Sequence, residues 1–168
     1  LNSLLSSIRW PDNVTIFGPE VERHLIEKNG KALAVVHGIS HAKAREGRNL
    51  ARLFRRETEQ PCFQLGVMHC TVDGETKADR YAPCSLDDLK DSGLDAWALG
   101  HVHERRTLSQ EPFVAYSGNS QGLHVNEAGP RGCLLVTARA ENLQDGQSAT
   151  ASSWQCQADF VRLGPVQW

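Results

Sequence analysis

Three of the seven histidines follow short apolar segments that predict β-strands. His69 directly follows the segment 63–68, and His101 and His103 follow the segment 95–99 across Gly100. Residues two apart in an extended segment point to the same side, so we expect His101 and His103 to converge on one site. Neutral imidazole is a good ligand for manganese, iron and zinc. The spacing therefore indicates a metal site at the ends of two strands.

Two histidines spaced two apart are a weak signal by themselves, because such pairs also occur as ordinary surface or partly buried side chains. The context favours a metal site, since Gly100 removes a side chain where a ligand must approach the backbone. Loops beyond strand ends also carry the reactive groups of many α/β enzymes. A ligand histidine needs a polar partner that fixes its ring, and Asp95 and Glu104 are the candidates. The other histidines lack this setting and are predicted to be structural or solvent-facing: His24, His37, His41 and His124.

The elements that position these histidines are predicted to be mixed strands and helices, with strands dominating the second half. Asn29-Gly30 is a strong hairpin signal, which predicts that the segments 21–27 and 31–40 pair with each other. Ser85, followed by acidic residues, predicts a helix start, and that helix ends near Gly93. The remaining expectations are a helix at 45–56 and strands at 14–17, 105–108, 113–116, 133–138 and 154–163, with a loop rich in Asn, Gln, Gly and Ser at 141–153.

Basic side chains occur at two places where they would be able to meet phosphate. The predicted helix 45–56 has a basic face opposite its apolar face, and an ordinary solvated face is the alternative interpretation. The loop 71–83 beside His69 is a candidate for lining a substrate groove, and an ordinary exposed loop is the alternative. The basic residues concerned are Arg48, Arg52, Arg55 and Arg56 in the helix and Lys77 and Arg80 in the loop.

Length and composition suit a single globular domain covering residues 1–168. The formal net charge of −2 argues against a protein that holds nucleic acid mainly through bulk positive charge. The five cysteines are an odd number without paired spacing, which favours the reducing cytoplasm. No stretch approaches the roughly 20 apolar residues that a membrane span requires, so no membrane partner is expected.

The histidine segments resemble the motifs of a known family. The segment 94–103, LDAWALGHVH, resembles the "ALGHxH" signature of the calcineurin-like metallophosphoesterases in its SbcD-like DNA repair exonuclease form. The segment 65–69, LGVMH, resembles the preceding family motif, in which an apolar strand ends in a ligand histidine.

Two further segments extend this resemblance over nearly all of residues 1–138. The segment 116–132 is similar to the family's "YPGSxQ…E…GxKG" tail, with Ser117 and Asn119 in place of its proline and first serine. The segment 10–14, WPDNV, resembles the "lPxNV" that follows the family's third motif. The tail narrows the resemblance to the nuclease-like members of the superfamily.

The resemblance implies a fold, a reaction and partners. The implied fold is an α+β four-layer sandwich, two mostly β sheets face to face with helices outside, of which this chain supplies the strand-rich second half. The implied reaction is hydrolysis of phosphodiester bonds in DNA with two divalent metal ions, and manganese is the expected ion. His69 and His101 would bind one ion and His103 the other. DNA and an ATPase of the SbcC type are the implied partners.

The family's upstream motifs have no counterpart in this sequence. An Asp-x-His, a Gly-Asp and a Gly-Asn-His-Asp are all absent, so no residue of this chain is predicted to be catalytic, and the expected catalytic histidine lies upstream. We expect the chain to be the C-terminal portion of the nuclease domain and to be inactive by itself; a natural pseudoenzyme is the alternative. An uncovered apolar sheet face would make it dimerise or retain its N-terminal portion.

Three functional classes are compatible with the sequence. A DNA exonuclease or endonuclease is favoured by the nuclease-like tail. A phosphoesterase for nucleotides or phosphoproteins would hydrolyse small phosphomonoesters but not DNA. A non-catalytic scaffold derived from the enzyme would lack the three missing motifs in the coding DNA upstream of Leu1.

Overall fold

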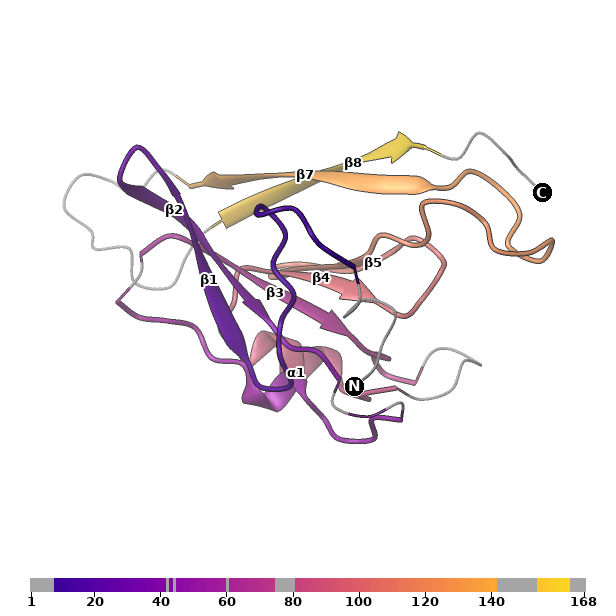
Figure 1. Cartoon of the computed structure of the whole chain (residues 1–168), viewed down its shortest axis with the longest axis horizontal. Coiled ribbons are helices and arrows are strands. Elements are labelled where there is room, and N and C mark those ends of the chain that lie inside the picture. The colour runs from indigo at the N-terminus through magenta and orange to yellow at the C-terminus, as the bar shows by residue number, and fades with distance from the viewer. Residues whose placement is uncertain are drawn as a thin grey trace.

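The described part of the chain is built mainly from strands, which form two sheets. The computed structural model describes residues 8–41, 43, 45–59, 61–74, 81–141 and 154–163. The strands are β1 (Glu22–Lys28), β2 (Lys31–Gly38), β3 (Phe63–His69), β4 (Ala96–Gly100), β5 (Arg106–Gln110), β6 (Phe113–Tyr116), β7 (Gly132–Ala140) and β8 (Trp154–Arg162). Six of them form one sheet in the order β1-β2-β3-β4-β6-β5, and β7 and β8 form a two-stranded ribbon. The ribbon covers one face of the six-stranded sheet, and the short helix α1 (Leu86–Lys90) lies on the other face (Figure 1).

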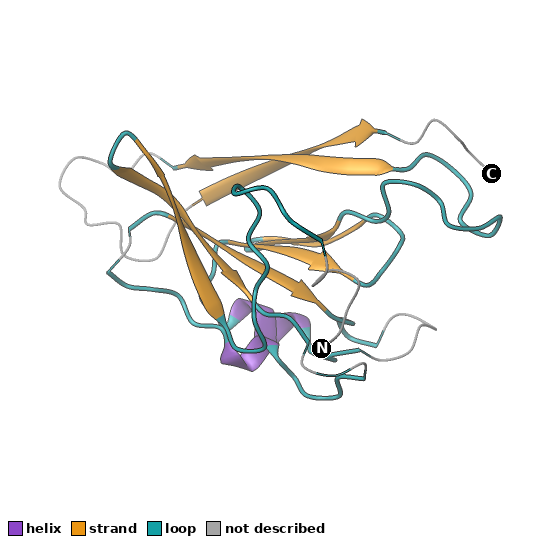
Figure 2. Cartoon of the chain, viewed as in Figure 1, coloured by secondary structure: helices purple, strands orange, loops and turns teal. Residues whose placement is uncertain are grey.

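The six-stranded sheet has a parallel centre and antiparallel edges (Figure 2). The predicted hairpin is confirmed, because β1 and β2 pair antiparallel. Asn29 and Gly30 both have positive φ, 54° and 71°, as the tight type I′ turn between two strands requires. Strands β2, β3, β4 and β6 run parallel, so their carboxyl ends meet at one edge of the sheet.

The centre of the sheet is fixed by packing against α1. Trp97 on β4 is fully buried, and its ring lies over Gly66 on β3, where a Cβ atom would clash with it. The indole Nε1 donates to the carbonyl of Leu89 in α1 (3.2 Å). The helix itself begins as predicted, because Ser85 and Asp88 form a reciprocal capping box. Strands β3 and β4 are thereby held side by side by the tight packing between the sheet and α1.

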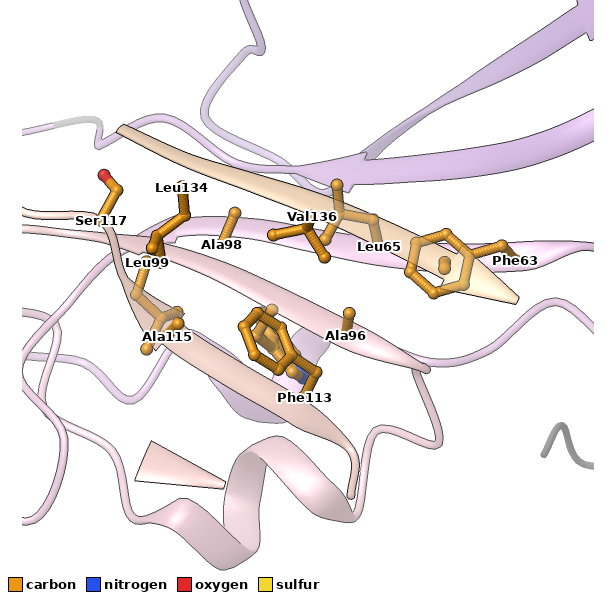
Figure 3. Close-up of a pocket in the computed structure, with 12 residues that line it drawn as sticks. Phe63, Leu65, Ala96, Ala98, Leu99, Phe113, Ala115, Ser117, Leu134 and Val136 are labelled. Atoms are coloured by element: carbon orange, nitrogen blue, oxygen red, sulfur yellow. The ribbon is translucent and has the colours of Figure 1, made fainter. Parts of the chain in front are cut away.

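The opposite face of the sheet is covered incompletely by the ribbon. Apolar side chains of β3, β4 and β6 face those of β7 across a cavity of about 220 Å³ (Figure 3). Much of the sheet side is alanine, as at Ala96, Ala98 and Ala115, so the two layers leave space between them. The cavity is therefore apolar and partly open.

The prediction of a helix at 45–56 is wrong. The described residues of this segment contain only a 3₁₀ turn, Ala51–Leu53, which ends where Phe54 adopts extended backbone. Arg52 in this turn donates to Asp88 (2.8 Å), which connects the segment to α1. The spacing of apolar residues in this segment indicates side chains that are buried, and Phe54 is indeed fully buried. Burial does not by itself require a helix.

The arginines of this segment are engaged within the chain. Arg48 pairs with Glu46 (2.7 Å), and Arg56 pairs with Asp95 (2.8 Å). Arg55 donates to two backbone carbonyls. These contacts favour a structural role over contact with phosphate.

Most other predicted elements are confirmed, in particular β3 to β8 and α1. Residues 14–17, which the structure describes, form no strand, so that prediction is wrong. Lys77, Arg80 and nearly all of the loop 141–153 lie outside the described residues. Among the described residues, no helix is long and apolar enough to cross a membrane. A mixed, strand-rich architecture with few helices is compatible with an α/β fold of the metallophosphoesterase type.

His37 on β2 makes the stability of this fold depend on pH. The ring is fully buried, its Nε2 lies 2.9 Å from Gln64 Oε1, and burial lowers its pKa below the usual 6.5. Below pH 6.5 the unfolded chain therefore binds a proton that the folded chain resists, and stability falls as the pH drops toward the pKa of the folded state. We expect the free energy of unfolding, measured by urea denaturation, to decrease between neutral pH and about pH 5. His37→Gln should decrease less; an equal decrease in both proteins would contradict this role.

Candidate metal centre

Two of the three predicted ligand histidines meet at the carboxyl ends of neighbouring parallel strands. His69 is the last residue of β3 and pairs in register with Gly100, the last residue of β4. His101 follows directly, and its Nδ1 lies 3.2 Å from Nε2 of His69. The sheet register therefore brings two ring nitrogens together from positions 32 residues apart in the sequence.

The backbone after β4 adopts an uncommon conformation to achieve this contact. His101 has a φ of 99°, a region that residues with side chains rarely occupy because Cβ crowds the backbone. At Gly100 a Cβ atom would lie 3.1 Å from Nδ1 of His69, which is tighter than normal packing. Gly100 thus allows the imidazole of His69 to lie against the backbone of the neighbouring strand.

Tyr116, at the end of β6, holds the backbone of the residues that follow His69. Its buried hydroxyl accepts a hydrogen bond from the backbone N–H of Val72 (3.1 Å) and donates to the carbonyl of Cys70 (2.9 Å). Burial raises the pKa of this hydroxyl well above its usual value, so it remains a neutral donor and acceptor. The loop after His69 is consequently anchored to a third strand of the sheet.

A fourth histidine, His41, lies beside this pair, although no sequence pattern predicts it there. Its ring centroid is 5.6 Å from that of His69, and Tyr81 packs against it at 4.4 Å. Tyr81 also contacts His69 and stacks on His101, with centroids 5.5 and 5.8 Å apart. Within the described part of the chain, Nε2 of His41 is buried and has no hydrogen-bond partner.

Glu127 is the polar partner of His103. The prediction that Asp95 and Glu104 are the partners of the histidines is wrong. Nδ1 of His103 lies 2.6 Å from Oε1 of Glu127. Asp95 pairs instead with Arg56, and the side chain of Glu104 is 76% exposed. The signal that would have found Glu127 is its place in the tail segment, where the family pattern also has a glutamate.

Burial and charge together keep His69 neutral. Its pKa is lowered to about 4, first by burial and then by the positive charge that His101, His41 and His103 carry when protonated. A neutral imidazole at pH 7 is the form that binds a metal ion, so no proton has to be removed before binding. The carboxylate of Glu127 is also ionised, because the N–H of Leu123 and the ring of His103 lower its pKa to about 2.

The donor atoms fit part of a metal site. Two nitrogens bound about 2.1 Å from one ion are roughly 3.0 to 3.4 Å apart, so the 3.2 Å between His69 and His101 suits two ligands of one ion. In the residues that the structure describes, no group of three or more His, Cys, Asp and Glu side chains is arranged to hold an ion. His69 and His101 are therefore compatible with an incomplete site that needs further ligands.

The contact between the two rings is testable without any metal. Replacing His101 with alanine removes a neighbouring positive charge and uncovers His69, so the pKa of His69 should rise from about 4 toward 6.5. The measurement is an NMR titration of the histidine ring protons. The exposed His24 on β1 provides the control, and His24→Ala should leave the titration of His69 unchanged. An unchanged pKa in His101→Ala would show that the rings do not interact.

Comparison with known proteins relates this chain to a metallophosphoesterase. No family model matches the chain. The chain is 43% identical over 131 residues to the "Uncharacterized metallophosphoesterase YhaO" of Bacillus subtilis (strain 168), which covers 77% of this chain and 32% of that relative. This chain thus spans about a third of the length of the relative. The relative is named as a metallophosphoesterase, in agreement with the resemblance of the histidine segments to the calcineurin-like superfamily.

Proposed function

We propose that the complete protein is a DNA nuclease of the SbcD-like type, which hydrolyses phosphodiester bonds with two divalent metal ions. The observation that carries the proposal is the convergence of His69 and His101, 3.2 Å apart, at the carboxyl ends of β3 and β4. Loops at this edge of a parallel sheet are where α/β enzymes bind their substrates. The nuclease-like tail, which supplies Glu127 beside His103, favours DNA over small phosphoesters.

In this proposal His69 and His101 hold one ion and His103 the other. Bound ions would polarise the phosphate, supply hydroxide at neutral pH and stabilise the leaving oxygen. Manganese is the proposed ion, because it accepts mixed nitrogen and oxygen ligands. The chain's own contribution is to keep His69 neutral and to fix the direction of the three rings. The group that protonates the leaving oxygen is proposed to lie in the N-terminal portion of the domain.

The remaining ligands are proposed to come from that N-terminal portion, which would complete a four-layer sandwich. Three histidines alone provide no negative charge to balance two cations, so the chain by itself should bind metal weakly and not cleave DNA. An ATPase of the SbcC type is the proposed partner of the complete enzyme. The cytoplasm is the proposed location, since all five cysteines are free thiols.

Cleavage of linear DNA by the protein expressed from its natural start tests the function. We expect cleavage that requires Mn²⁺ and stops on chelation. His101→Ala should reduce it at least about 100-fold, because losing a ligand removes several kcal/mol of transition-state stabilisation. His24→Ala, on the exposed strand β1, is the matched control and should retain full activity.

Each outcome of this assay distinguishes the functional classes. Hydrolysis of nucleotides or phosphomonoesters without DNA cleavage would replace the nuclease by another phosphoesterase. A folded protein with neither activity would indicate a scaffold. Cleavage that persists in His101→Ala would contradict the proposed metal ligands.

The ribbon of β7 and β8 is the proposed contact surface for the rest of the domain or for a second copy. Neither strand has a second neighbour among the described residues, and Leu135 on β7 is 60% exposed. The ribbon also borders the open apolar cavity above β4 and β6 (Figure 3). Exposed apolar surface beside free strand edges favours association.

Light scattering on the isolated chain tests this surface. We expect a mass above the 18.6 kDa of a monomer, or a retained N-terminal fragment. Leu135→Glu should shift the chain toward the monomer, because it places a charge on the exposed ribbon. Leu123→Glu, in a loop where Leu123 is 68% exposed, is the control and should leave the mass unchanged. A clean monomer of the unmodified chain, with nothing bound, would contradict the proposal.

A further inference from the structure

The carboxylate of Glu127 is surrounded by hydrogen-bond donors on both of its oxygens. Oε1 lies 2.6 Å from Nδ1 of His103. Oε2 accepts from the backbone N–H of Leu123 (2.9 Å) and from the side-chain amide of Asn119 (3.1 Å). The Glu127 residue is 9% exposed, so these contacts are largely shielded from water. Its place is fixed by the loop that contributes Asn119 and Leu123, independently of His103.

This arrangement decides which nitrogen of His103 carries the proton. An ionised carboxylate can only accept hydrogen bonds, so the atom facing Oε1 must be a donor. Nδ1–H of His103 therefore donates to Glu127, and in the neutral ring Nε2 is left with the lone pair. The nitrogen that can bind a metal ion is consequently Nε2.

The backbone around His103 is held by the same loop. Arg131 donates from Nη1 to the carbonyl of His103 (2.6 Å) and from Nε to the carbonyl of Glu127 (3.2 Å). The N–H of Asn119 donates to the carbonyl of His103 as well (3.1 Å). At Gly118 a Cβ atom would lie 2.8 Å from that carbonyl oxygen, so only glycine permits this approach. Ring and backbone of His103 are thus both fixed by the segment 118–131.

We propose that Glu127 is a positioning residue of the metal centre, which selects the tautomer of His103 with Nε2 free for metal. Arg131 and Gly118 support it by fixing the backbone on which the imidazole is mounted. The proposal deepens the proposed function and rests on it only in assigning the free nitrogen to a metal ion. The choice of tautomer follows from the hydrogen bonds alone.

A single isosteric substitution distinguishes this role from simple packing. In Glu127→Gln the amide has one acceptor oxygen and one NH₂ group. The two donors of Asn119 and Leu123 face the Oε2 position, so the oxygen belongs there and the NH₂ faces His103. Nδ1 must then accept, which moves the proton to Nε2. Glu127→Gln should therefore invert the tautomer while preserving shape.

The experiment is a long-range ¹H–¹⁵N NMR spectrum of the full chain labelled with ¹⁵N-histidine, without metal. It is recorded near pH 8.5, above the usual histidine pKa of about 6.5, and His103→Gln assigns the signals. We expect a protonated Nδ1 in the unmodified chain and a protonated Nε2 in Glu127→Gln. Glu104→Gln is the matched control, because Glu104 adjoins His103 in sequence but is exposed, and its spectrum should match the unmodified chain.

The inference is overturned if unmodified His103 is protonated at Nε2 or at both nitrogens, or if Glu127→Gln leaves the tautomer unchanged. In the complete protein, Glu127→Gln should also weaken Mn²⁺ binding about 10- to 100-fold, while Glu104→Gln does not. The NMR result requires neither metal nor DNA. A failure of the proposed nuclease function is therefore distinguishable from a failure of this inference.

Discussion

The in-register pairing of β3 with β4 is the constraint on which the site depends. Parallel pairing of His69 with Gly100 sets both histidine-bearing loops at one edge of the sheet, and a slip by one residue would turn the two side chains to opposite faces. The register is protected by Trp97, whose ring occupies the space over Gly66 and whose indole is tied to α1. A packing contact below the sheet thus determines the distance between two nitrogens at its edge.

The three histidines are positioned by different physical means. His69 and His101 depend on strand geometry, on a strained backbone and on the absence of a side chain at Gly100. His103 depends on a separate loop that supplies an ionised carboxylate and a guanidinium. Rigid sheet and polar loop therefore position the two parts of the proposed metal centre independently, so a substitution in the loop can disturb His103 without disturbing the pair.

Much of the fold was predictable, because local signals were strong where they decided the structure. Asn29-Gly30 and the capping box at Ser85 report interactions between near neighbours in sequence, and the apolar segments predict strands without showing which of them pair. The failures arose where distant contacts decide. The segment 45–56 forms a single 3₁₀ turn, and its Arg52 pairs with Asp88, which is distant in sequence. Glu127 reaches His103 across 24 residues, and His41 reaches His69 through folding of the chain, so spacing along the sequence could not reveal either contact.

The backbone conformation of His101 affects which substitutions this protein is expected to accumulate during evolution. A φ of 99° suits glycine far better than histidine, so a chain selected for stability alone would carry glycine at position 101. The imidazole persists at this position against a local energetic preference that the rest of the sheet must offset. Mutational drift without selection for chemistry would therefore be expected to remove this side chain early and to leave the fold intact or firmer. The identity of residue 101 in a related sequence is accordingly a sensitive sign of whether that relative keeps the proposed metal centre.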